Sequence, residues 1–409
     1  PQAGKTEISV VILTYKKYKL LAELLPSIIR QKPETFEVIV VDNACLPETK
    51  KVVFDAFEAD ETARKTPFKY LPICDNPGYA IGNNKGVEIA SHKDVKWIQF
   101  MNDDVVLQGE SFFKDMMELS EFQPNAGGAV CKLLTHGGEE LIEAGSIVWN
   151  DASAAGIGRG EMSYNKPSLS YAKPVDYGSG ACLMLRKDIF VKYRGFDHKN
   201  FPNYYEDTDL QLHVQHDLGK EIWYQPKAVA FHAEHGSFSQ ANAKALMKSS
   251  KKNFVKKWGN RLVANHLENP HAYEPHEREL QFMRASDTRA RDPSKANILW
   301  LEQAAPNPDN GSGFGRAFDN LCMAAELGHR ITLVMQQKIT ASWCNKKCRD
   351  RITGLGVEMI TGDWEEYVDE YIDFYDIVYV SRPAIFQITY KKWQEVYEKY
   401  SFVLIYDCE

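Results

Sequence analysis

The amino-acid sequence predicts an α/β protein with at least two domains. Short β-branched apolar runs alternate with segments of helical apolar spacing near the N-terminus, and the same alternation returns after residue 296. The chain has 409 residues, of which 44% are hydrophobic and 26% charged. This length and composition are sufficient for two hydrophobic cores, so we expect two α/β units joined in one chain.

The first region, residues 1–265, opens with alternating strands and helices. Strands are predicted at residues 8–13, 36–41, 69–73 and 96–101, and helices at residues 20–30, 49–59 and 83–91. This order predicts a parallel sheet covered by helices on both faces. Because no Gly-x-Gly-x-x-Gly follows the first strand, a standard dinucleotide-binding domain is disfavoured.

The remainder of the first region has fewer clear signals. A glycine-rich segment spans residues 177–185, and a strand is predicted at residues 228–231. A lysine-rich amphipathic helix over residues 243–258 is expected to close the domain. Its lysines favour a solvated helix face, with contact to a membrane surface or a phosphate-bearing lipid as the alternative.

Residues 266–296 are rich in charge, histidine and proline, and we predict a linker there. The third region, residues 297–409, is predicted as a second α/β unit with strands at 297–302, 330–334, 376–380 and 402–406. A glycine-rich loop at 311–316 precedes its first helix. Since the chain lacks an initial methionine and stops just after an apolar run, we expect it to be a piece of a longer protein.

Charge and cysteine usage exclude several classes of protein. A net charge of −7 and a pI near 5.9 argue against a general nucleic-acid binder. No apolar stretch approaches the ~20 residues of a transmembrane helix. The eight cysteines are scattered, which favours reduced thiols and a cytoplasmic location. Cys344 and Cys348 would share a helix face, but further zinc ligands are not nearby, so a structural role is favoured.

Two acidic clusters and a histidine carry the chemical signal. Asn102-Asp103-Asp104 follows a buried strand, at the edge where open α/β sheets bind ligands. Adjacent acids repel each other unless a cation compensates them, and a divalent metal holding a diphosphate is the simplest explanation. The cluster Glu206-Asp207-Thr208-Asp209 can supply a base, and His232 a further metal ligand. Each feature also has a plainer structural interpretation. The first cluster could be a polar turn, the second a charged helix start, and His232 an ordinary surface residue.

These residues form part of an ordered set that resembles the inverting family-two glycosyltransferases of the GT-A fold, especially rhamnosyltransferase-like members. The resemblance covers residues 8–260 and runs through Val10–Tyr15, Val40–Asn43, Asn76–Ala80, Asn83–Gly86, Asn102–Asp104, Gly178–Ala181, Gly195–Asp197, Tyr205–Leu210 and His232. It implies a nucleotide-diphospho-sugar transferase fold. Residues 297–409 resemble the N-terminal half of a family-four GT-B glycosyltransferase, so that region would be a truncated Rossmann-like domain.

The first resemblance implies a role for each matching residue. Asp207 would be the general base, with Glu206 as second choice, and Asp104 and His232 would bind Mn²⁺ or Mg²⁺, the histidine favouring Mn²⁺. Asp42 would accept a hydrogen bond from a pyrimidine ring and Asp103 would contact the ribose or a metal-bound water; His235 fits a ligand role less well. The remaining donor-binding residues would be Thr14, Tyr15, Asn76, Gly78 and Asn83.

The implied reaction is metal-dependent inverting transfer of a sugar from a UDP- or dTDP-linked donor. Its acceptor would be a hydroxyl group of a glycan or a lipid-linked molecule in surface polysaccharide synthesis. The protein would act in the cytoplasm or, as an alternative, at the cytoplasmic membrane surface. A sugar-1-phosphate nucleotidyltransferase would need a glycine-rich loop after the first strand, and Thr14-Tyr15-Lys16-Lys17 lacks glycine. The third alternative is a non-catalytic carbohydrate-binding module, against which the presence of Asp104, Asp207 and His232 argues.

Overall fold

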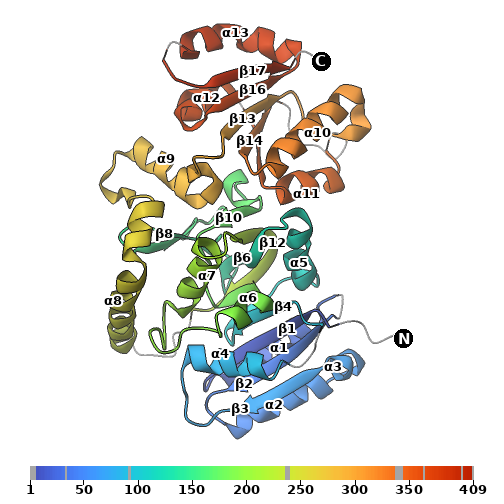
Figure 1. The fold of residues 1–409 in the computed structure, drawn as a ribbon. Helices are drawn as coiled ribbons and strands as arrows, with labels where there is room; N and C mark the ends of the chain where they lie inside the picture. The colour runs from blue at the N-terminus through green and yellow to red at the C-terminus, as the bar shows by residue number, and fades with distance from the viewer. Residues whose placement is uncertain are drawn as a thin grey trace. The chain divides into compact units, whose positions relative to one another are not determined.

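The computed structural model describes residues 6–32, 35–90, 94–234, 240–336, 344–362, 364–397 and 399–407. Ser91, at the end of a predicted helix, and His235 lie outside these ranges. The chain forms two compact units (Figure 1). Unit 1 comprises Pro1–Tyr164 and Val175–Asn269, and unit 2 comprises Asn165–Pro174 and Pro270–Glu409.

The main sheet of unit 1 is mixed rather than wholly parallel. Its strands run in the order β12-β6-β11-β4-β1-β2-β3, where β1 is Ile8–Thr14, β2 Phe36–Asp42, β3 Phe68–Pro72, β4 Trp97–Asn102, β6 Ala126–Thr135, β11 Cys182–Arg186 and β12 Glu221–His232. β1 to β4 pair in parallel as predicted, but β11 is antiparallel to both β4 and β6. The parallel sheet predicted from the strands of residues 8–101 therefore forms, and the glycine-rich segment at 177–185 adds a reversed strand that makes the complete sheet mixed.

Helices and short strands complete unit 1. The helices are α1 (Tyr18–Ile29), α2 (Pro47–Glu58), α3 (Glu61–Lys65), α4 (Tyr79–Glu88), α5 (Phe112–Phe122), α6 (Lys187–Lys192), α7 (Glu206–His216) and α8 (Gln240–Asn265). The short strands are β5 (Val105–Leu107), which pairs with β12, β7 (Leu141–Glu143), which pairs with β6, and the separate pair β8 (Ser146–Val148) and β9 (Ala154–Gly156). The predicted strands and helices of residues 8–102 thus all form.

Helix α4 begins earlier than predicted because a glycine turns the chain into it. Gly78 has φ 93°, a left-handed conformation that favours glycine, and it precedes the first helical residue, Tyr79. Within α4, a Cβ at Gly86 would lie 2.5 Å from Val11 Cγ1 and 2.9 Å from Val41 Cγ2. The missing side chain therefore lets α4 pack closely on β1 and β2, and Figure 1 shows these three elements side by side.

Strand β6 was not predicted because two adjacent glycines weaken its strand signal. A Cβ at Gly127 would lie 2.5 Å from Val214 Cγ1, and one at Gly128 would lie 2.6 Å from Leu185 Cδ2. The glycines thus permit close packing at the centre of the sheet. Trp223 and Tyr224, on the neighbouring strand β12, are 2% and 0% exposed, so they are core residues.

Helix α8 closes unit 1 against the helix that carries the second acidic cluster. Phe254, Trp258 and Leu262 of α8 are buried in a cluster with Leu212 of α7. Trp258 Nε1 donates to Asp209 Oδ1 at 2.7 Å, and Lys257 Nζ lies 2.7 Å from the same oxygen. Asp209 therefore anchors α8 to α7.

Unit 2 is built on a five-stranded parallel sheet in the order β15-β14-β13-β16-β17, the strand order 3-2-1-4-5 of Rossmann-like folds. Its elements are β10 (Lys173–Val175, which runs one residue into unit 1), α9 (Pro275–Ser286), β13 (Asn297–Glu302), α10 (Ser312–Glu326), β14 (Arg330–Met335), α11 (Lys346–Gly354), β15 (Val357–Thr361), α12 (Trp364–Tyr371), β16 (Ile377–Ser381), α13 (Pro383–Tyr397) and β17 (Val403–Asp407). The region predicted as a linker includes α9, whose Leu280 is buried in the core of this unit.

The cysteines do not all remain as thiols. Cys45 and Cys74 form a disulfide, which corrects the expectation of wholly reduced cysteines. Cys344 and Cys348 are free and buried, and nowhere in the described ranges do three or more His, Cys, Asp or Glu side chains gather as a preformed metal site. Over the same ranges, no helix is both long and apolar enough to cross a membrane.

Candidate active site

A cavity of about 370 Å³ lies in unit 1 at the carboxyl ends of β1, β2 and β4. Parallel strands of an α/β sheet present their loops at this edge, where ligands usually bind. The polar side chains around it include Tyr15 after β1, Asn43 after β2, Asp103 and Asp104 after β4, Glu206 and Asp207 at the start of α7, and His232 at the end of β12. Both acidic clusters and the histidine therefore border one cavity.

Asp103 is held by the end of β1. Thr14 Oγ1 donates to Asp103 Oδ2 at 2.7 Å, and the Tyr15 amide donates to the same oxygen at 3.3 Å. Burial raises the pKa of Asp103 to about 6, although these hydrogen bonds oppose the shift. Thr14 itself does not border the cavity; it orients Asp103, which does.

Asp104 and His232 meet because of strand register. β5 follows Asp104 directly and pairs antiparallel with β12, so that His232 lies opposite Val105. This places His232 Nε2 3.1 Å from Asp104 Oδ1. Lys17 Nζ lies 3.8 Å from the other carboxylate oxygen. A carboxylate and an imidazole thus converge on the cavity, a donor pair that suits a divalent cation such as Mn²⁺.

Glu206 and Asp207 open α7 after two residues in strained backbone conformations. Tyr204 and Tyr205 have φ 67° and φ 72°, which is uncommon for residues other than glycine. Asp207 accepts hydrogen bonds from the backbone amides of Gly180 and Thr208, at 2.8 and 2.7 Å. Glu206 Oε2 is buried and has no hydrogen-bond partner in the described part of the chain.

The two acids differ in their ability to hold charge. Burial, and then the charge of Asp207, raises the pKa of Glu206 well above its usual range. Burial also raises the pKa of Asp207, but the amides of Gly180 and Thr208 stabilise its carboxylate and oppose the shift. Asp207 is therefore the better candidate for an ionised acid that can accept a proton.

A short loop before β11 holds Asp207 in place. Tyr79 Oη donates to the Gly180 carbonyl at 2.7 Å, and Glu143 Oε1 accepts from the Ser179 amide at 2.8 Å. A Cβ at Gly180 would lie only 2.7 Å from Tyr79 Oη and 3.1 Å from Asp207 Oδ2. Glycine is thus required here so that the backbone amide can approach the carboxylate.

Two asparagines and a glycine form another side of the cavity. Asn43 Nδ2 donates to the Gly78 carbonyl at 3.2 Å and to Asn76 Oδ1 at 3.4 Å. Asn43 Oδ1 is buried without a hydrogen-bond partner among the described residues, so it can accept from a ligand. Asn83 does not border the cavity; its Nδ2 donates to the Tyr79 carbonyl at 3.1 Å and stabilises α4.

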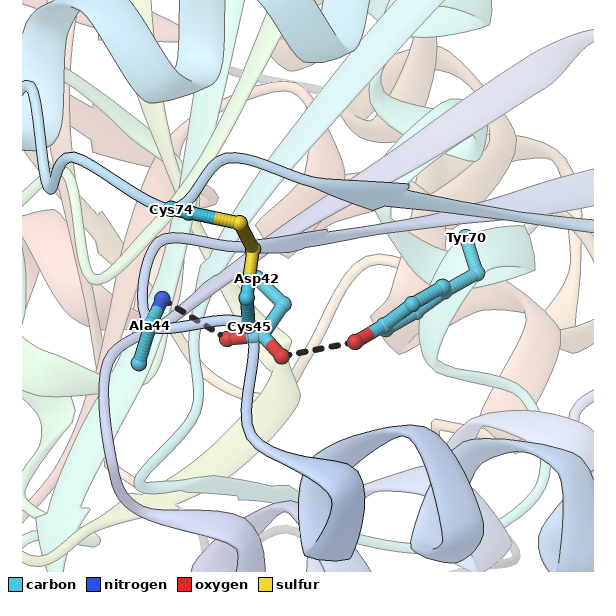
Figure 2. Close-up of a disulfide and its surroundings, with 5 residues drawn as sticks. All are labelled: Asp42, Ala44, Cys45, Tyr70 and Cys74. Carbon is cyan, nitrogen blue, oxygen red and sulfur yellow. Dashed lines mark hydrogen bonds between the residues drawn. A yellow bond between two sulfur atoms is a disulfide. The ribbon is translucent and has the colours of Figure 1, made fainter.

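Asp42 lies beside the cavity but does not border it. It is fully buried, and Figure 2 shows both of its oxygens engaged. Oδ1 accepts from the Ala44 amide at 2.9 Å, and Oδ2 accepts from the Tyr70 hydroxyl at 2.7 Å. A base N–H that reached Asp42 would have to share Oδ2 with this hydroxyl, so base recognition by Asp42 stays a prediction.

Residues 9–194 match the protein-family model described as glycosyl transferase family 2. Over these residues the chain is therefore similar to the family 2 glycosyltransferases. A curated relative is an uncharacterized protein, y4gI, from Sinorhizobium fredii (strain NBRC 101917 / NGR234), which is 24% identical over 247 residues. That match covers 58% of this chain, which spans only about a quarter (25%) of the relative's length.

Solved structures similar to the chain include three that are 12–14% identical to it. The mannosyltransferase PcManGT from Pyrobaculum calidifontis, in complex with GDP-Man and Mn²⁺, has a TM-score of 0.42, with 64% of this chain and 73% of that one covered. S. aureus TarS 1-349 has a TM-score of 0.38, with 69% and 82% covered. GalNAc-T7 with UDP, GalNAc and Mn²⁺ has a TM-score of 0.46, with 68% and 54% covered.

The cavity of unit 1 is also lined by residues that were not predicted as site residues, among them Lys17, Tyr79, Asn203, Tyr204 and Glu234. Tyr79 lies within the matching segment Asn76–Ala80, and Lys17 lies two residues after Val10–Tyr15, so position in or near these segments was a usable signal. Tyr204 directly precedes the segment Tyr205–Leu210, and Asn203 lies one residue further away, but an asparagine and a tyrosine in a loop are too common to be singled out. Glu234 forms a bidentate ion pair with Arg159, in which Arg159 Nη2 lies 2.8 Å from Glu234 Oε1.

Proposed function

We propose that unit 1 transfers a sugar from a UDP- or dTDP-linked donor to a hydroxyl group of a glycan or lipid-linked acceptor, with inversion at the anomeric carbon. The observation that carries this proposal is that Asp103, Asp104, His232, Glu206 and Asp207 border one cavity. This site combines a place for a metal diphosphate with a buried base. The family 2 match over residues 9–194 supports the same reaction class.

The residues present fit a divalent cation. Asp104 Oδ1 and His232 Nε2 lie 3.1 Å apart and both border the cavity, so a shared ion could replace their direct contact. The other ligands would come from the diphosphate and water, since Mn²⁺ and Mg²⁺ accept oxygen donors readily. When bound, the ion would offset the charge that develops on the departing nucleoside diphosphate.

The nucleotide would lie between the ends of β1, β2 and β4. Asp103, held by Thr14 and Tyr15, would accept hydrogen bonds from the ribose or from water. Asn43 would accept a hydrogen bond through its unpartnered Oδ1, and Asn76 and Gly78 complete the same side of the cavity. Base recognition by Asp42 remains part of the proposal and requires Tyr70 to share the carboxylate.

Asp207 would act as the general base. Its Oδ2 accepts from the Gly180 amide and borders the cavity, so a proton from the acceptor hydroxyl can be taken up there as the hydroxyl oxygen attacks the sugar. Attack from the face opposite the leaving group inverts the configuration in one step. Glu206, with its raised pKa, would remain protonated and donate a hydrogen bond within the same site.

Donor turnover provides the direct test of this proposal. The full chain would be incubated with Mn²⁺ and a panel of UDP-, dTDP- and GDP-sugars, and free nucleoside diphosphate would be measured. We expect release from a UDP- or dTDP-sugar, and release that is slower by roughly 10²-fold or more from Asp207→Asn. Release of pyrophosphate from sugar-1-phosphate and nucleoside triphosphate would instead identify a nucleotidyltransferase, and binding of glycan without turnover would identify a binding module.

The acceptor is proposed to be a glycan or lipid-linked hydroxyl at the cytoplasmic membrane surface. Lys248, Lys252 and Lys256 are exposed on α8, a face that can approach anionic headgroups at the cytoplasmic membrane surface. Transfer assays with a soluble glycan and with the same glycan on a lipid carrier would separate the two acceptor classes. Faster transfer to the lipid-linked acceptor, lost when the three lysines are changed to glutamine, would support surface polysaccharide synthesis.

Unit 2 is proposed to be half of a GT-B enzyme. Its parallel sheet and the glycine-rich loop at the start of α10 support an α/β ligand-binding unit. Because GT-B enzymes bind their nucleotide between two such halves, residues 297–409 should not catalyse transfer alone. A glycosyltransferase activity that survives Asp207→Asn in the full chain would contradict this proposal.

A further inference from the structure

A disulfide joins two loops beside the proposed nucleotide site. Cys45 follows β2, Cys74 follows β3, and their sulfur atoms are bonded at 2.12 Å (Figure 2). β2 and β3 pair in parallel with Asp42 opposite Pro72, so both loops leave the same edge of the sheet. The disulfide therefore ties neighbouring loops together at the edge where the cavity lies.

Each of these loops supplies a cavity residue two positions from its cysteine. Asn43 precedes Cys45 by two residues, Asn76 follows Cys74 by two, and both border the cavity. The Asn43 side chain bridges the loops through hydrogen bonds of 3.2 Å to Gly78 and 3.4 Å to Asn76. These distances are long for such bonds, so the covalent link is the strongest connection between the two loops.

The backbone of both loops adopts conformations that residues other than glycine rarely take. Cys45 has φ 55° and Asn76 has φ 42°. Such left-handed conformations are disfavoured for side chains with a Cβ and persist only where the surroundings enforce them. Without the disulfide, we expect these residues to relax and to carry Asn43 and Asn76 with them.

The disulfide is accessible to a small reductant. Cys74 is exposed and Cys45 is partly exposed. The other cysteines of the described ranges, Cys131, Cys182, Cys322, Cys344 and Cys348, are free and buried. Among the described residues, a mild dithiol can therefore reduce this disulfide while the other cysteines are already thiols.

We propose that the Cys45–Cys74 disulfide positions Asn43, Asn76 and Gly78 for the nucleoside diphosphate, and that its reduction reversibly weakens donor binding; this rests on the proposed function of unit 1. Reduction by a dithiol breaks the S–S bond. Two electrons and two protons pass to Cys45 and Cys74, which become thiols, while the dithiol closes to its own disulfide. A mild oxidant such as oxidised glutathione reverses the step.

Nucleotide binding to the full chain tests the proposal. Calorimetric titration with UDP and with dTDP, each with Mn²⁺, would be done before and after treatment with dithiothreitol and again after reoxidation. We expect affinity about tenfold weaker in the reduced protein, because two loops must then be ordered on binding, and recovery on reoxidation. In turnover assays the donor KM should rise by the same factor, while kcat at saturating donor stays within about twofold.

The double variant Cys45→Ser/Cys74→Ser is the matched control. It should bind the nucleotide as weakly as the reduced wild type and should not respond to dithiothreitol, which excludes an effect of the reagent on Mn²⁺ or on other cysteines. Equal affinity of the oxidised and reduced wild-type protein would overturn the proposal. An effect of dithiothreitol on the double variant as large as on the wild type would also overturn it.

Hydrogen–deuterium exchange without ligand separates this proposal from the proposed function. Reduction should speed exchange at the backbone amides of residues 43–46 and 73–79 and leave β1 and β4 unchanged. Faster exchange throughout unit 1 would mean that the disulfide only supports the fold, and unchanged exchange would mean that it constrains nothing. If neither redox state bound any nucleotide, the proposed function would fail, and the exchange pattern alone would decide the role of the disulfide.

Discussion

At the residue scale, the two neighbouring acids at the start of α7 differ in what they can do. Asp207 accepts hydrogen bonds from two backbone amides, whereas Glu206 has a buried oxygen without a hydrogen-bond partner among the described residues. Backbone amides favour the ionised form of a carboxyl group, and burial without donors favours the neutral form. This difference supports the proposal that Asp207 acts as the base while Glu206 stays protonated.

Asp207→Asn should remove the base and leave the donor site intact. The amide keeps the shape of the side chain but cannot take up the acceptor proton. We expect kcat to fall by roughly 10²-fold or more while donor affinity stays near wild type. Steady-state kinetics with a confirmed acceptor, together with calorimetric donor binding, would measure both quantities.

Two further variants serve as a surface control and as a test of which acid is the base. Asp55→Asn on α2, where Asp55 pairs with Lys51 at the surface, should behave as wild type. Glu206→Gln should retain more activity than Asp207→Asn if Glu206 is already protonated. An inactive Glu206→Gln beside a fully active Asp207→Asn would move the base by one residue, and two fully active variants would contradict the single-displacement mechanism.

Asp104→Ala should abolish metal-dependent nucleotide binding. The variant removes the carboxylate that lies 3.1 Å from His232 and leaves that imidazole without its cavity-side partner. Titration of UDP with and without Mn²⁺ would measure the effect, with exposed Asp60→Asn as a control for a general loss of charge. Unchanged Mn²⁺ dependence in Asp104→Ala would show that another residue holds the ion.

The sequence was more informative about acids at strand ends than about acids elsewhere. Asp103 and Asp104 border the cavity as expected, because a buried strand brings its terminal residues to one edge of the sheet. Asp209 belonged to the same acidic cluster in sequence, yet it binds Trp258 and Lys257. Helical geometry turns neighbouring residues to different sides, and sequence alone does not show which partner a distant helix will offer.

At the element scale, the loop before β11 determines the position of Asp207. The Gly180 amide reaches the carboxylate because glycine has no side chain there. Gly180→Ala should displace Tyr79 or Asp207, lower kcat by about tenfold or more, and destabilise unit 1 by about 1–3 kcal/mol. Thermal melts and initial rates would measure both effects.

Gly137→Ala provides the comparison for this substitution. A Cβ at Gly137 would have its nearest neighbour at 3.6 Å, an ordinary van der Waals contact, so stability and rate should remain near wild type. An equally damaging Gly137→Ala would indicate a general sensitivity of glycine positions. A harmless Gly180→Ala would show that Asp207 does not depend on this close approach.

Strands with continuous apolar runs were predictable, and strands defined by packing were not. β1, β2 and β13 begin where the apolar pattern predicted, because parallel strands buried on both faces need such runs. β6 carries glycines that only its close neighbours explain, and the antiparallel direction of β11 depends on the path of the chain between strands. Neither property is encoded in a local window of sequence.

At the whole-molecule scale, unit 1 should fold when the chain ends after Asn269. His266 Nδ1 lies 2.8 Å from the Val148 carbonyl, and the Asn150 amide donates to the Leu267 carbonyl at 3.0 Å. A chain ending at residue 269 keeps both contacts and should bind nucleotide as the full chain does. A chain ending at residue 265 loses both hydrogen bonds, each of which contributes about 1 kcal/mol to the free energy of unfolding. Its melting temperature should therefore be roughly 4–8 °C lower.

Calorimetric melts and nucleotide titrations of the two shortened chains would test this expectation. Equal melting temperatures would show that residues 266–269 do not belong to the fold of unit 1. Loss of nucleotide binding in the chain that ends at 269 would show that unit 2 completes the site.

Unit 2 should lose stability in acid through Asp287. This carboxylate is fully buried and accepts from Arg289 Nε at 3.0 Å and Nη2 at 2.7 Å. Burial alone would raise the pKa of Asp287, but the charge and hydrogen bonds of Arg289 outweigh it and lower the pKa. A carboxyl group with a lowered folded-state pKa contributes stability above its unfolded pKa of about 3.9, and this contribution disappears as the pH falls through the folded-state value.

Asp287→Asn should therefore destabilise unit 2 by about 3–5 kcal/mol at pH 7, because it leaves Arg289 buried without its counter-charge. The difference from wild type should narrow as the pH falls below about 4 and through the lowered folded-state pKa of Asp287, at which the wild-type carboxyl group also becomes neutral. Melts at pH 7, 5 and 3 would measure this, with exposed Asp319→Asn as the control. A difference that stayed constant with pH would argue against an ionised Asp287.

The segment Asn165–Pro174 has a consequence for how the chain acquires its structure during synthesis. It belongs to unit 2, and the Ala172 amide donates to the Thr353 carbonyl at 2.9 Å, a partner that lies far later in the chain. Tyr171 and Lys173 are also buried within this unit. On a ribosome that adds residues from the N-terminus, unit 1 can collapse once Asn269 emerges, but this segment must wait until residue 353 has been made. During that interval its aromatic and basic side chains are available to chaperones and proteases, and translation pauses between residues 269 and 353 should prolong that exposure.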